Sequence, residues 1–354
     1  MRRLLIASLC LLAACSSAPA PEATQPPARP AGCKTPQVFA SVPGYTPIYA
    51  DRGPGGAYSE VDPAAYAAMK QRMEAFWNDL NAWLAMSNAV AAGKPGTQSA
   101  CAIRWLEDWA AGAHMLSPPK DADVAAQYQS RYEMKWALQG IATAYALVLR
   151  REATPAQHAR IAPWLRAAGR EVAAFNIERP GDGKLNNHYY WGGAAAMAAG
   201  VATDDADLIR LARRTYEAGI DSIAADGSLP RERTRRQQAL HYHGYSLTPL
   251  TLMAELARLR GEDWYAYKPE QLPKLVAVVT RGMRDPAWGA DFFGTPQSAE
   301  LIKTCSDNRA WSIFWRKRDP DGIGPLAPPP GECSYRSLGG DLAMLMQRGY
   351  FRGR

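Results

Sequence analysis

The stretch NNHYYWGGAAAMAAGV, residues 186–201, joins a polar and aromatic cluster to a run of very small side chains. Glycine and alanine occupy most positions from 192 to 200, so a helix built from them has little side-chain bulk. Neighbouring helices can approach such a helix closely, because the distance between helix axes depends on the side chains at the contact. We therefore expect a helix over residues 187–201 that packs closely against its neighbours, with the polar cluster at its start.

Helical periodicity also dominates the sequence on both sides of this stretch. Asp62 and Pro63 form a helix-start signal, an N-cap followed by proline at the first helical position. Apolar residues then recur at three- and four-residue steps as far as Leu84. Further helices are expected over residues 103–113, 127–149, 155–175, 208–224, 237–258, 269–283, 308–316 and 338–347.

The sequence contains no convincing segment with the alternation of polar and apolar residues that indicates a half-buried strand. About ten helices joined by turns rich in glycine and proline predict an all-α protein. We expect an α/α toroid, or incomplete α/α barrel, with an open cleft at one end.

The N-terminal residues predict export rather than a folded element. Residues 1–14 combine a short basic start with an apolar run too short to span a bilayer, which is typical of a signal peptide. The LAAC sequence that ends at Cys15 is similar to a bacterial lipobox, so we expect cleavage before Cys15 and its lipidation. An ordinary signal peptide with an incidental cysteine is the alternative. Residues 15–31 are rich in proline and alanine and predict a tether, which leaves residues 32–354 as one large domain.

The residue after the expected lipidation site indicates the membrane. Ser16 stands where an aspartate would favour retention at the inner membrane. We therefore expect a lipoprotein of the outer membrane that faces the periplasm or the cell surface, with the lipid as its sole membrane contact.

The expected domain keeps four cysteines, an even number in an oxidising compartment. Four cysteines allow three pairings, and we favour Cys33 with Cys101 and Cys305 with Cys333. A zinc site is disfavoured, because no two of these cysteines have the C-x-x-C spacing. We expect two disulfides and neither a metal nor another cofactor.

The net charge indicates the class of partner. The chain carries +7, or +5 without Arg2 and Arg3 of the expected signal peptide. A cleft lined with one sign of charge concentrates ligands of the other sign, so an anionic polymer is the expected partner. Nucleic acid is implausible as the partner of an exported protein, and a basic surface without a ligand is the alternative that charge alone leaves open.

A second polar cluster, RERTRRQ at residues 231–237, runs into His241, Tyr242 and His243. Arg235 and Tyr242 are seven residues apart, nearly two helical turns, so we expect both on one side of a helix. A hydrogen-bonded helix start with solvated arginines is the alternative for any single residue here. Together with the first cluster, however, these residue types favour chemistry on an anionic sugar.

The chemistry in question is removal of the C5 proton of a uronate, a carbon acid whose carboxylate resists further negative charge. Asn187 can donate a hydrogen bond to that carboxylate and Arg235 can pair with it, which shifts electron density off the carbon. We expect the positive charge of Arg235 to lower the pKa of Tyr242. Tyr242 can then act as base toward C5 and as acid toward the glycosidic oxygen. His188 is the other nearby group whose charge switches near neutral pH.

These motifs resemble those of the alginate lyase family of polysaccharide lyases, family 5. The resemblance begins with NHxYW at residues 187–191 and continues with LP at 229–230 and RRQxALxYH at 235–243. The spacing of 54 residues from His188 to Tyr242 matches the family pattern. Similarity extends over nearly the whole domain, to KWAL at 135–138, AY at 144–145, DN at 307–308, AW at 310–311, Arg336 and LGG at 338–340.

The resemblance implies a lyase domain that cleaves a 1,4-linked uronate polymer by metal-independent β-elimination and leaves 4,5-unsaturated uronate ends. Asn187 and Arg235 would neutralise the carboxylate. Tyr242 would act as base and acid in syn elimination on mannuronate, and as acid only in anti elimination. His188 would be the base in the anti case and otherwise a charge-neutralising partner. The residues expected to contact the sugar chain are Lys135, Trp136, Tyr190, Trp191, Trp311 and Arg336.

The sequence departs from the family pattern at positions that are expected to contact the substrate. Family members carry a lysine in a mobile loop near the N-terminus, whereas residues 48–56 contain none and offer Arg52 as the nearest cation. His241 precedes Tyr242 where a small residue is expected, and Arg236 follows the predicted carboxylate-binding arginine. We count Arg52, Arg236 and His241 among the expected substrate contacts. The predicted substrate is mannuronate-containing alginate or a related polyuronate such as polyglucuronate.

Two other functions are compatible with parts of the sequence. A glycoside hydrolase on the same toroid needs a pair of carboxyl groups as acid and base, and Glu107, Asp108 and Asp182 are the suggestive acids. They lack a convincing partner. A non-catalytic polyuronate-binding lipoprotein would keep the basic cleft without needing Tyr242 beside Arg235. In each case we expect a monomer.

Overall fold

The computed structural model describes residues 28–52, 56–179, 185–298 and 304–352. The expected signal peptide, Cys15, most of the expected tether and Asp182 lie outside these residues. In chain order, the helices are α1 (Pro63–Ala91), α2 (Thr97–Ala111), α3 (Val124–Leu147), η1 (Leu149–Arg151), α4 (Pro155–Ala173), η2 (Ala174–Glu178), α5 (Asn187–Thr203), α6 (Ala206–Asp221), α7 (Pro230–Arg233), η3 (Arg236–Gln238), α8 (Ala239–Arg258), η4 (Trp264–Ala266), α9 (Gln271–Arg284), α10 (Pro286–Phe293), α11 (Trp311–Trp315), α12 (Pro320–Ile323), η6 (Gly324–Leu326) and α13 (Leu342–Gln347).

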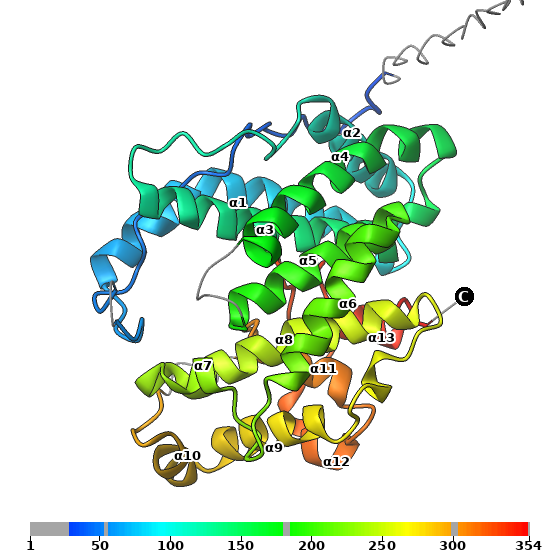
Figure 1. Cartoon of the computed structure of the whole chain (residues 1–354). Coiled ribbons are helices and arrows are strands. Elements are labelled where there is room, and N and C mark those ends of the chain that lie inside the picture. Colours follow the sequence, from blue (N-terminus) through cyan, green and yellow to red (C-terminus); the bar gives the residue numbers. More distant parts are fainter. Residues whose placement is uncertain (1–27, 53–55, 180–184, 299–303, 353–354) are drawn as a thin grey trace, which may run out of the picture.

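The all-α prediction is confirmed, and the helices form an incomplete α/α toroid. In the described residues, β-structure is limited to isolated bridges between Tyr49 and Val61 and between Tyr335 and Gly340. Figure 1 shows α1 to α4 in the upper part, α7 to α12 in the lower part, and α5 and α6 between them. No helix in the described ranges is long and apolar enough to cross a membrane.

The helix of small residues, α5, lies at the centre of the fold. It packs against α3, α4, α6 and α8, and residues 190–200 are all buried. A Cβ atom on Gly192 would come within 2.6 Å of the Asn176 side chain, and one on Gly193 would overlap Thr215 of α6. The close packing expected from the sequence is therefore confirmed, and its cause is the missing side-chain volume of α5.

Asp-Pro pairs start helices at three places in the chain. The side chain of Asp62 caps α1 by accepting hydrogen bonds from two backbone N–H groups of the first turn. Asp285 and Asp319 cap α10 and α12 in the same way, each followed by proline at the first helical position. The sequence signal was recognised at α1, whereas α10 and α12 were not predicted because both are short and lack a long apolar period.

One helix starts later in the structure than the sequence predicts, and backbone conformation explains the difference. The helix predicted over residues 338–347 begins only at Leu342, because Gly339 and Gly340 have φ values of +96° and +113°. Such values lie in the left-handed region, which an α-helix excludes. Asp341 then caps the helix by accepting a hydrogen bond from Met344 N–H.

Both predicted disulfides are present. Cys33–Cys101 ties the N-terminal arm to α2, and the Trp105 indole donates a hydrogen bond to the Lys34 carbonyl oxygen of the same arm at 2.6 Å. Cys305–Cys333 joins two segments that are 28 residues apart and that both reach a cavity wall described below. The predicted pairing is therefore confirmed.

The packing of α3 against the segment before α13 generates a stability prediction. Gly140 in α3 lies so close to the Arg336 carbonyl oxygen that a Cβ atom there would overlap it. We expect Gly140→Ala to lower the free energy of unfolding by about 1–3 kcal/mol, because the backbone around Arg336 must move. Thermal unfolding measures this change. Gly324→Ala is the matched control, since nothing lies within 4 Å of a Cβ atom at Gly324; equal stability of the two variants would contradict the prediction.

Candidate active site

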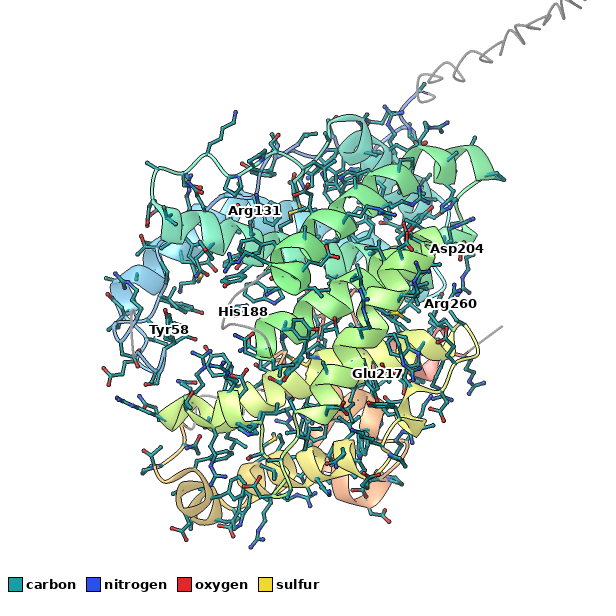
Figure 2. The ribbon with its side chains drawn as sticks, viewed as in Figure 1. Tyr58, Arg131, His188, Asp204, Glu217 and Arg260 are labelled. Atoms are coloured by element: carbon teal, nitrogen blue, oxygen red, sulfur yellow. A yellow bond between two sulfur atoms is a disulfide. The ribbon has the colours of Figure 1, made fainter. Side chains whose placement is uncertain are left out.

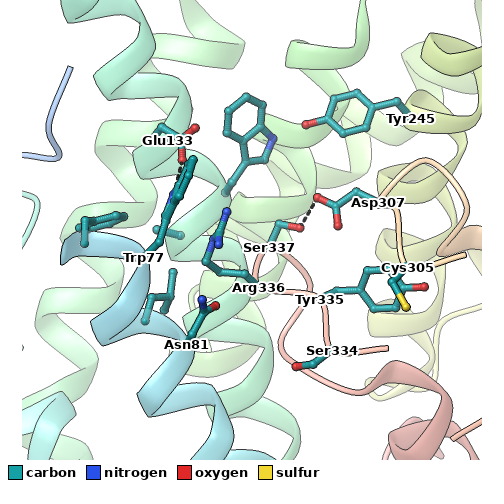
Figure 3. A pocket seen from close by; sticks show the side chains of 14 residues that line it. Trp77, Asn81, Glu133, Tyr245, Cys305, Asp307, Ser334, Tyr335, Arg336 and Ser337 are labelled. Atoms are coloured by element: carbon teal, nitrogen blue, oxygen red, sulfur yellow. Dashed lines mark hydrogen bonds between the residues drawn. The ribbon is translucent and has the colours of Figure 1, made fainter. Parts of the chain in front are cut away.

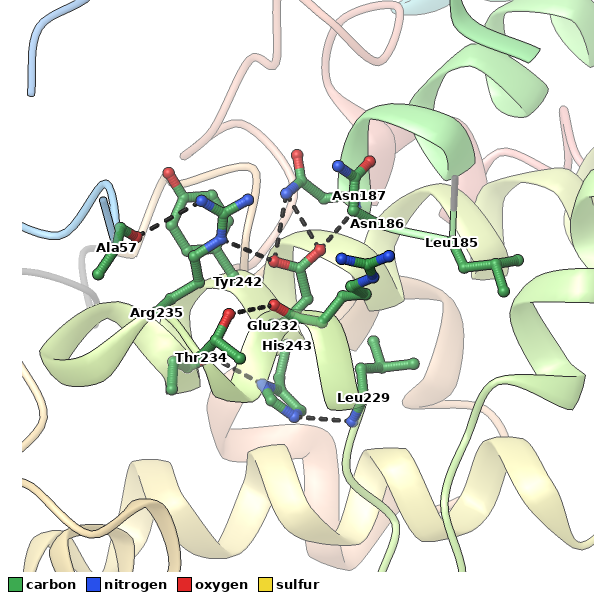
Figure 4. Close-up of polar contacts among 12 residues, drawn as sticks. Ala57, Leu185, Asn186, Asn187, Leu229, Glu232, Thr234, Arg235, Tyr242 and His243 are labelled. Atoms are coloured by element: carbon green, nitrogen blue, oxygen red, sulfur yellow. Dashed lines mark hydrogen bonds and ion pairs between the residues drawn. The ribbon is translucent and has the colours of Figure 1, made fainter. Parts of the chain in front are cut away.

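Asn187, at the start of α5, and Arg235, in the turn after α7, both contact the buried carboxylate of Glu232 on α7 (Figure 4). Glu232 has no exposed surface. Its carboxylate accepts hydrogen bonds from the backbone N–H of Asn187 at 2.6 Å and from the Asn187 side-chain amide at 3.1 Å. The same carboxylate forms an ion pair with Nε of Arg235 at 3.5 Å. Glu232 therefore fixes Asn187 and Arg235 relative to each other.

Arg235 lies between α7 and η3, and so is not on the helix that carries Tyr242. The expectation that both residues share one side of a helix is wrong, because Arg236 has a φ of +49° and interrupts helical backbone between them. The two side chains meet all the same. The guanidinium carbon of Arg235 lies 5.0 Å from the centroid of the Tyr242 ring. The turn after α7, rather than helical spacing, brings them together.

Tyr242 holds its proton more tightly than the sequence suggested. Burial raises the pKa of Tyr242 well above its usual value, and the neighbouring Tyr49 raises it further. The two hydroxyl oxygens are 2.8 Å apart. Arg235 acts in the opposite direction but is the smaller influence, so the prediction of a lowered pKa is wrong. Loss of hydration disfavours the phenolate more than one nearby cation favours it.

His188 lies at the start of α5 (Figure 2), and its ring contacts both an aromatic ring and a buried amine. Its ring stacks on Tyr132 with centroids 3.9 Å apart, and its Nδ1 lies 2.9 Å from Nζ of Lys135. Burial holds the pKa of His188 well below its usual value, and the neighbouring Lys135 and Arg235 act in the same direction. The imidazole is therefore uncharged at neutral pH, with Nε2 as the ring nitrogen left for a ligand.

The loop formed by residues 48–52 and 56–61 contacts this group through Tyr49. Within the loop, the Asp51 carboxylate accepts a hydrogen bond from the Ser59 N–H at 2.8 Å. Arg52 is exposed and donates to the Tyr49 carbonyl oxygen at 2.9 Å. Because Arg52 binds its own loop, the structure does not place it with the catalytic group, and the expectation that it takes the place of a lid lysine is not met.

A cavity of about 480 Å³ lies between α1, α3 and the segment before α13 (Figure 3), next to this cluster but not lined by Asn187, His188, Arg235 or Tyr242. Trp136 connects the two regions, since it lines the cavity and its ring centroid lies 6.1 Å from that of His188. Arg336 also lines the cavity, with its guanidinium carbon 4.3 Å from the Trp77 ring. Trp136 and Arg336 are therefore placed where a sugar can reach them.

Two carboxyl groups, buried Glu133 and half-buried Asp307, share this cavity wall. Glu133 accepts hydrogen bonds from the Tyr45 hydroxyl and the Trp77 indole, while Asp307 accepts one from Ser337. Burial raises the pKa of both carboxyl groups.

Four of the residues expected to contact the sugar are in the core instead. Lys135, Tyr190, Trp191 and Trp311 have no exposed surface. The Trp191 indole donates to a backbone carbonyl oxygen of α8 at 2.9 Å, and the Tyr190 hydroxyl donates to the Leu185 carbonyl oxygen at 2.9 Å. The prediction that these four residues contact substrate is therefore wrong, because each is enclosed in the core, Trp311 where α11 packs against α8.

His241 and Arg236 lie at the edge of the group. The His241 ring meets Tyr242 edge-on at 5.0 Å, and its Nδ1 accepts a hydrogen bond from the Asn308 side chain at 3.1 Å. Burial lowers the pKa of His241 to about 4, so the ring is neutral. Arg236 is exposed. Substrate contact by either residue stays a prediction.

The acids considered for hydrolysis are engaged elsewhere. Glu107 of α2 is buried and pairs with Arg160. Asp108 pairs with Arg29 at 2.6 Å and with Arg104 at 3.0 Å. Both carboxylates neutralise arginines on the outer side of the N-terminal half, so they do not form the facing pair that hydrolysis requires.

Sequence reasoning missed three residues of the group. Glu232 had a usable signal, since it precedes Arg235 by three residues and a helical turn places such residues side by side. Tyr132 likewise precedes Lys135 by three residues on α3. Tyr49 had no local signal, because its partner lies 193 residues away in the chain.

Comparisons with known proteins agree with this geometry. A family model described as alginate lyase matches residues 56–288. A polysaccharide lyase from Stenotrophomonas maltophilia (strain K279a) is 37% identical, over 98% of this chain and 95% of its own length. An alginate lyase from Cobetia marina is 34% identical over 55% of this chain, which corresponds to 51% of that protein.

Solved structures show the same relationship. A histidine-to-alanine variant of alginate lyase A1-III complexed with a tetrasaccharide superposes with a TM-score of 0.71 at 26% identity, covering 91% of this chain and 88% of that one. The crystal structure of alginate lyase A1-III from Sphingomonas species A1 superposes with a TM-score of 0.68 at 26% identity, covering 88% and 85%.

The position of Glu232 generates a second stability prediction. We expect Glu232→Ala to lower the free energy of unfolding by about 3–5 kcal/mol, because it leaves Arg235 and the Asn187 N–H without their buried partner. Denaturant unfolding followed by circular dichroism measures the change. The control is Glu217→Ala, which removes a half-exposed ion pair with Arg213 and should cost about 0–1 kcal/mol. A similar small cost at both positions would refute the role of Glu232.

Proposed function

Because the chain belongs to the alginate lyase family and is a polysaccharide lyase, we propose that it cleaves a 1,4-linked uronate polymer by β-elimination. The proposal rests on one observation. Two distant segments of the chain, one with Asn187 and His188 and the other with Arg235 and Tyr242, lie close together. Asn187 and Arg235 share the Glu232 carboxylate, and Arg235 lies against the Tyr242 ring. His188 follows Asn187 directly at the start of α5. The products would be shorter chains with 4,5-unsaturated uronate ends.

The arrangement supplies what removal of a C5 proton needs. The guanidinium of Arg235 is available to the uronate carboxylate, because its ion pair with Glu232 uses Nε and leaves most of its other donors. Binding there spreads the negative charge that develops at C5. Since a fixed cation from the chain itself performs this task, the proposed reaction needs no metal ion.

The protonation states of the site support distinct roles for Tyr242 and His188. A phenol with a raised pKa carries the proton that the glycosidic oxygen must receive, so Tyr242 is proposed as the acid. An uncharged His188 is ready to accept the C5 proton in anti elimination. In syn elimination on mannuronate, Tyr242 would perform both transfers and would first have to lose its own proton.

The cavity wall supports a substrate preference for alginate rich in mannuronate or a related polyuronate. Arg336 on the Trp77 ring offers a cation beside an aromatic face, a combination suited to a sugar carboxylate and its ring. His241 adds bulk directly beside Tyr242. A non-catalytic binding protein would need the residues of the cavity wall but would not need Tyr242 as an acid.

The proposal about location rests on the N-terminal sequence. We propose that the protein is a monomeric lipoprotein of the outer membrane, anchored through Cys15 and exposed to the periplasm or the cell surface. Cys15→Ala should release the protein into the soluble fraction of cells, because lipid attachment supplies the membrane affinity. Immunoblots of membrane and soluble fractions check this, with Cys10→Ala as the control that should stay in the membrane fraction. Equal distribution of the two variants would reject the anchor.

The catalytic role of Tyr242 is tested by removing only its hydroxyl group. We expect Tyr242→Phe to lower kcat by about 10²-fold or more, the scale of general acid–base catalysis, while substrate binding is nearly unchanged. Ultraviolet absorbance of the unsaturated product measures turnover on mannuronate-rich alginate, guluronate-rich alginate and polyglucuronate. Tyr216→Phe is the matched control, since Tyr216 is also fully buried but lies on α6 away from the site.

The same assay separates the alternatives. A wild-type protein that binds these polymers without producing absorbance would be a binding protein. New reducing ends without absorbance would indicate hydrolysis. Near-normal kcat in Tyr242→Phe would remove the hydroxyl group from the mechanism.

A further inference from the structure

Lys135 is a fully buried lysine whose nitrogen contacts the imidazole of His188. Its Nζ lies 2.9 Å from Nδ1 of His188, 4.7 Å from the centroid of the Tyr132 ring and 4.6 Å from that of Trp136. The side chain has no exposed surface. Lys135 therefore cannot meet a substrate, although it sits directly behind a group that can.

The surroundings of Lys135 disfavour an ammonium ion. No carboxylate of the described residues forms an ion pair with Nζ. Glu133, two positions earlier on α3, is the acid that acts on it, but it is bound to the Tyr45 hydroxyl and the Trp77 indole. Burial of a cation without a paired anion is costly, and a buried lysine responds by losing its proton. Burial accordingly holds the pKa of Lys135 well below its usual value.

A neutral amine next to Nδ1 favours a proton on Nδ1, because an imidazole N–H is a better donor than an amine N–H and the amine nitrogen is a good acceptor. The uncharged amine has a lone pair that can accept a hydrogen bond from Nδ1–H, whereas an ammonium ion can only donate. Neutral imidazole carries one proton, so a proton on Nδ1 leaves Nε2 with its lone pair free. The other groups that face this pair are Tyr132, Trp136 and Arg235. Tyr132 is uncharged because burial raises its pKa, Trp136 is apolar at its ring face, and Arg235 disfavours a further positive charge on His188.

We propose that Lys135 is a positioning residue that acts as a neutral amine, accepts a hydrogen bond from Nδ1–H of His188 and thereby holds Nε2 unprotonated toward the substrate. This inference rests on the proposed lyase function. It makes His188 the base of anti elimination and Lys135 the residue that keeps Nε2 of His188 unprotonated.

The proton balance of the reaction can be written with these groups. Nε2 of His188 takes the C5 proton as the C5–H electron pair forms the C4–C5 double bond. The C4–O bond breaks, and the leaving oxygen takes the proton of the Tyr242 phenol. His188 then releases the proton it gained on Nε2 to solvent and keeps its proton on Nδ1, while the Tyr242 phenolate takes one proton back from solvent. The pair of His188 and Lys135 therefore ends each cycle as it began.

Two variants of Lys135 separate a neutral amine from a buried cation. Lys135→Met keeps an unbranched side chain of similar length without the amine. It should lower kcat on guluronate-rich alginate, where anti elimination makes His188 the proposed base, by about 10²-fold with KM nearly unchanged. Lys135→Arg keeps a permanent cation that cannot accept a hydrogen bond, so it should not restore kcat. Thr143→Val on the same helix, also fully buried, is the matched control and should keep the wild-type kcat.

Nitrogen-15 NMR of the imidazole gives a readout that a merely structural role would not move. In the wild-type protein without substrate, we expect His188 to be protonated on Nδ1 and free on Nε2 at neutral pH. In Lys135→Met, the share of the opposite tautomer should rise. This measurement on the wild type does not depend on whether either variant folds.

The outcomes distinguish this inference from the proposed function. Absence of lyase activity in the wild type would reject the proposed function itself. With an active wild type, a proton on Nε2 in the resting enzyme, near-normal kcat in Lys135→Met or restored kcat in Lys135→Arg would each overturn the role of Lys135. Loss of kcat in both Lys135 variants together with the Nδ1-protonated tautomer would support it.

Discussion

The structure depends on the close approach of four helices to α5. Its glycine and alanine residues leave room for α3, α4, α6 and α8 to pack against the helix axis. This packing buries Asn187 and Tyr190 in the first turn of α5 and leaves His188 partly exposed. The altered pKa values of the site follow from this packing, because burial is the largest cause of the shift for His188, Lys135 and Tyr242. These protonation states therefore depend on the small side chains of α5, which let the neighbouring helices pack closely and bury the catalytic group.

The parts of the fold that the sequence predicted are those with local causes. The pair Asp62 and Pro63 starts α1 because the cap and the proline act within one turn. Gly339 and Gly340 show where local reasoning failed, since their left-handed backbone lies where the segment passes close to α3 at Gly339 and to Asn88 of α1 at Gly340. Both disulfide pairings were predicted, which reflects the small number of ways in which four cysteines can pair.

The sequence predicted which residues belong to the candidate site better than it predicted their burial and pKa values. Asn187, His188, Arg235 and Tyr242 stand out by residue type, and the structure brings Arg235 and Tyr242 into contact although not by the helical spacing invoked for them. Burial could not be read from the sequence. Trp136 lines the cavity and Trp191 lies in the core, yet both occur in similar aromatic motifs. The direction of the Tyr242 pKa was misjudged for the same reason, since a single cation is visible in a sequence and loss of hydration is not.

The bond between Cys305 and Cys333 has a consequence for the order of events in the life of the protein. It joins the segment that carries Asp307 to the one that carries Ser337, two residues of the cavity wall that otherwise meet through a single hydrogen bond. Disulfides persist in oxidising compartments, whereas the cytosol keeps thiols reduced. With the export proposed above, a newly made chain would complete this wall only after it has left the reducing environment of its synthesis. Covalent closure of the cavity wall would then be a late step of maturation, set by where the chain is rather than by how fast it folds.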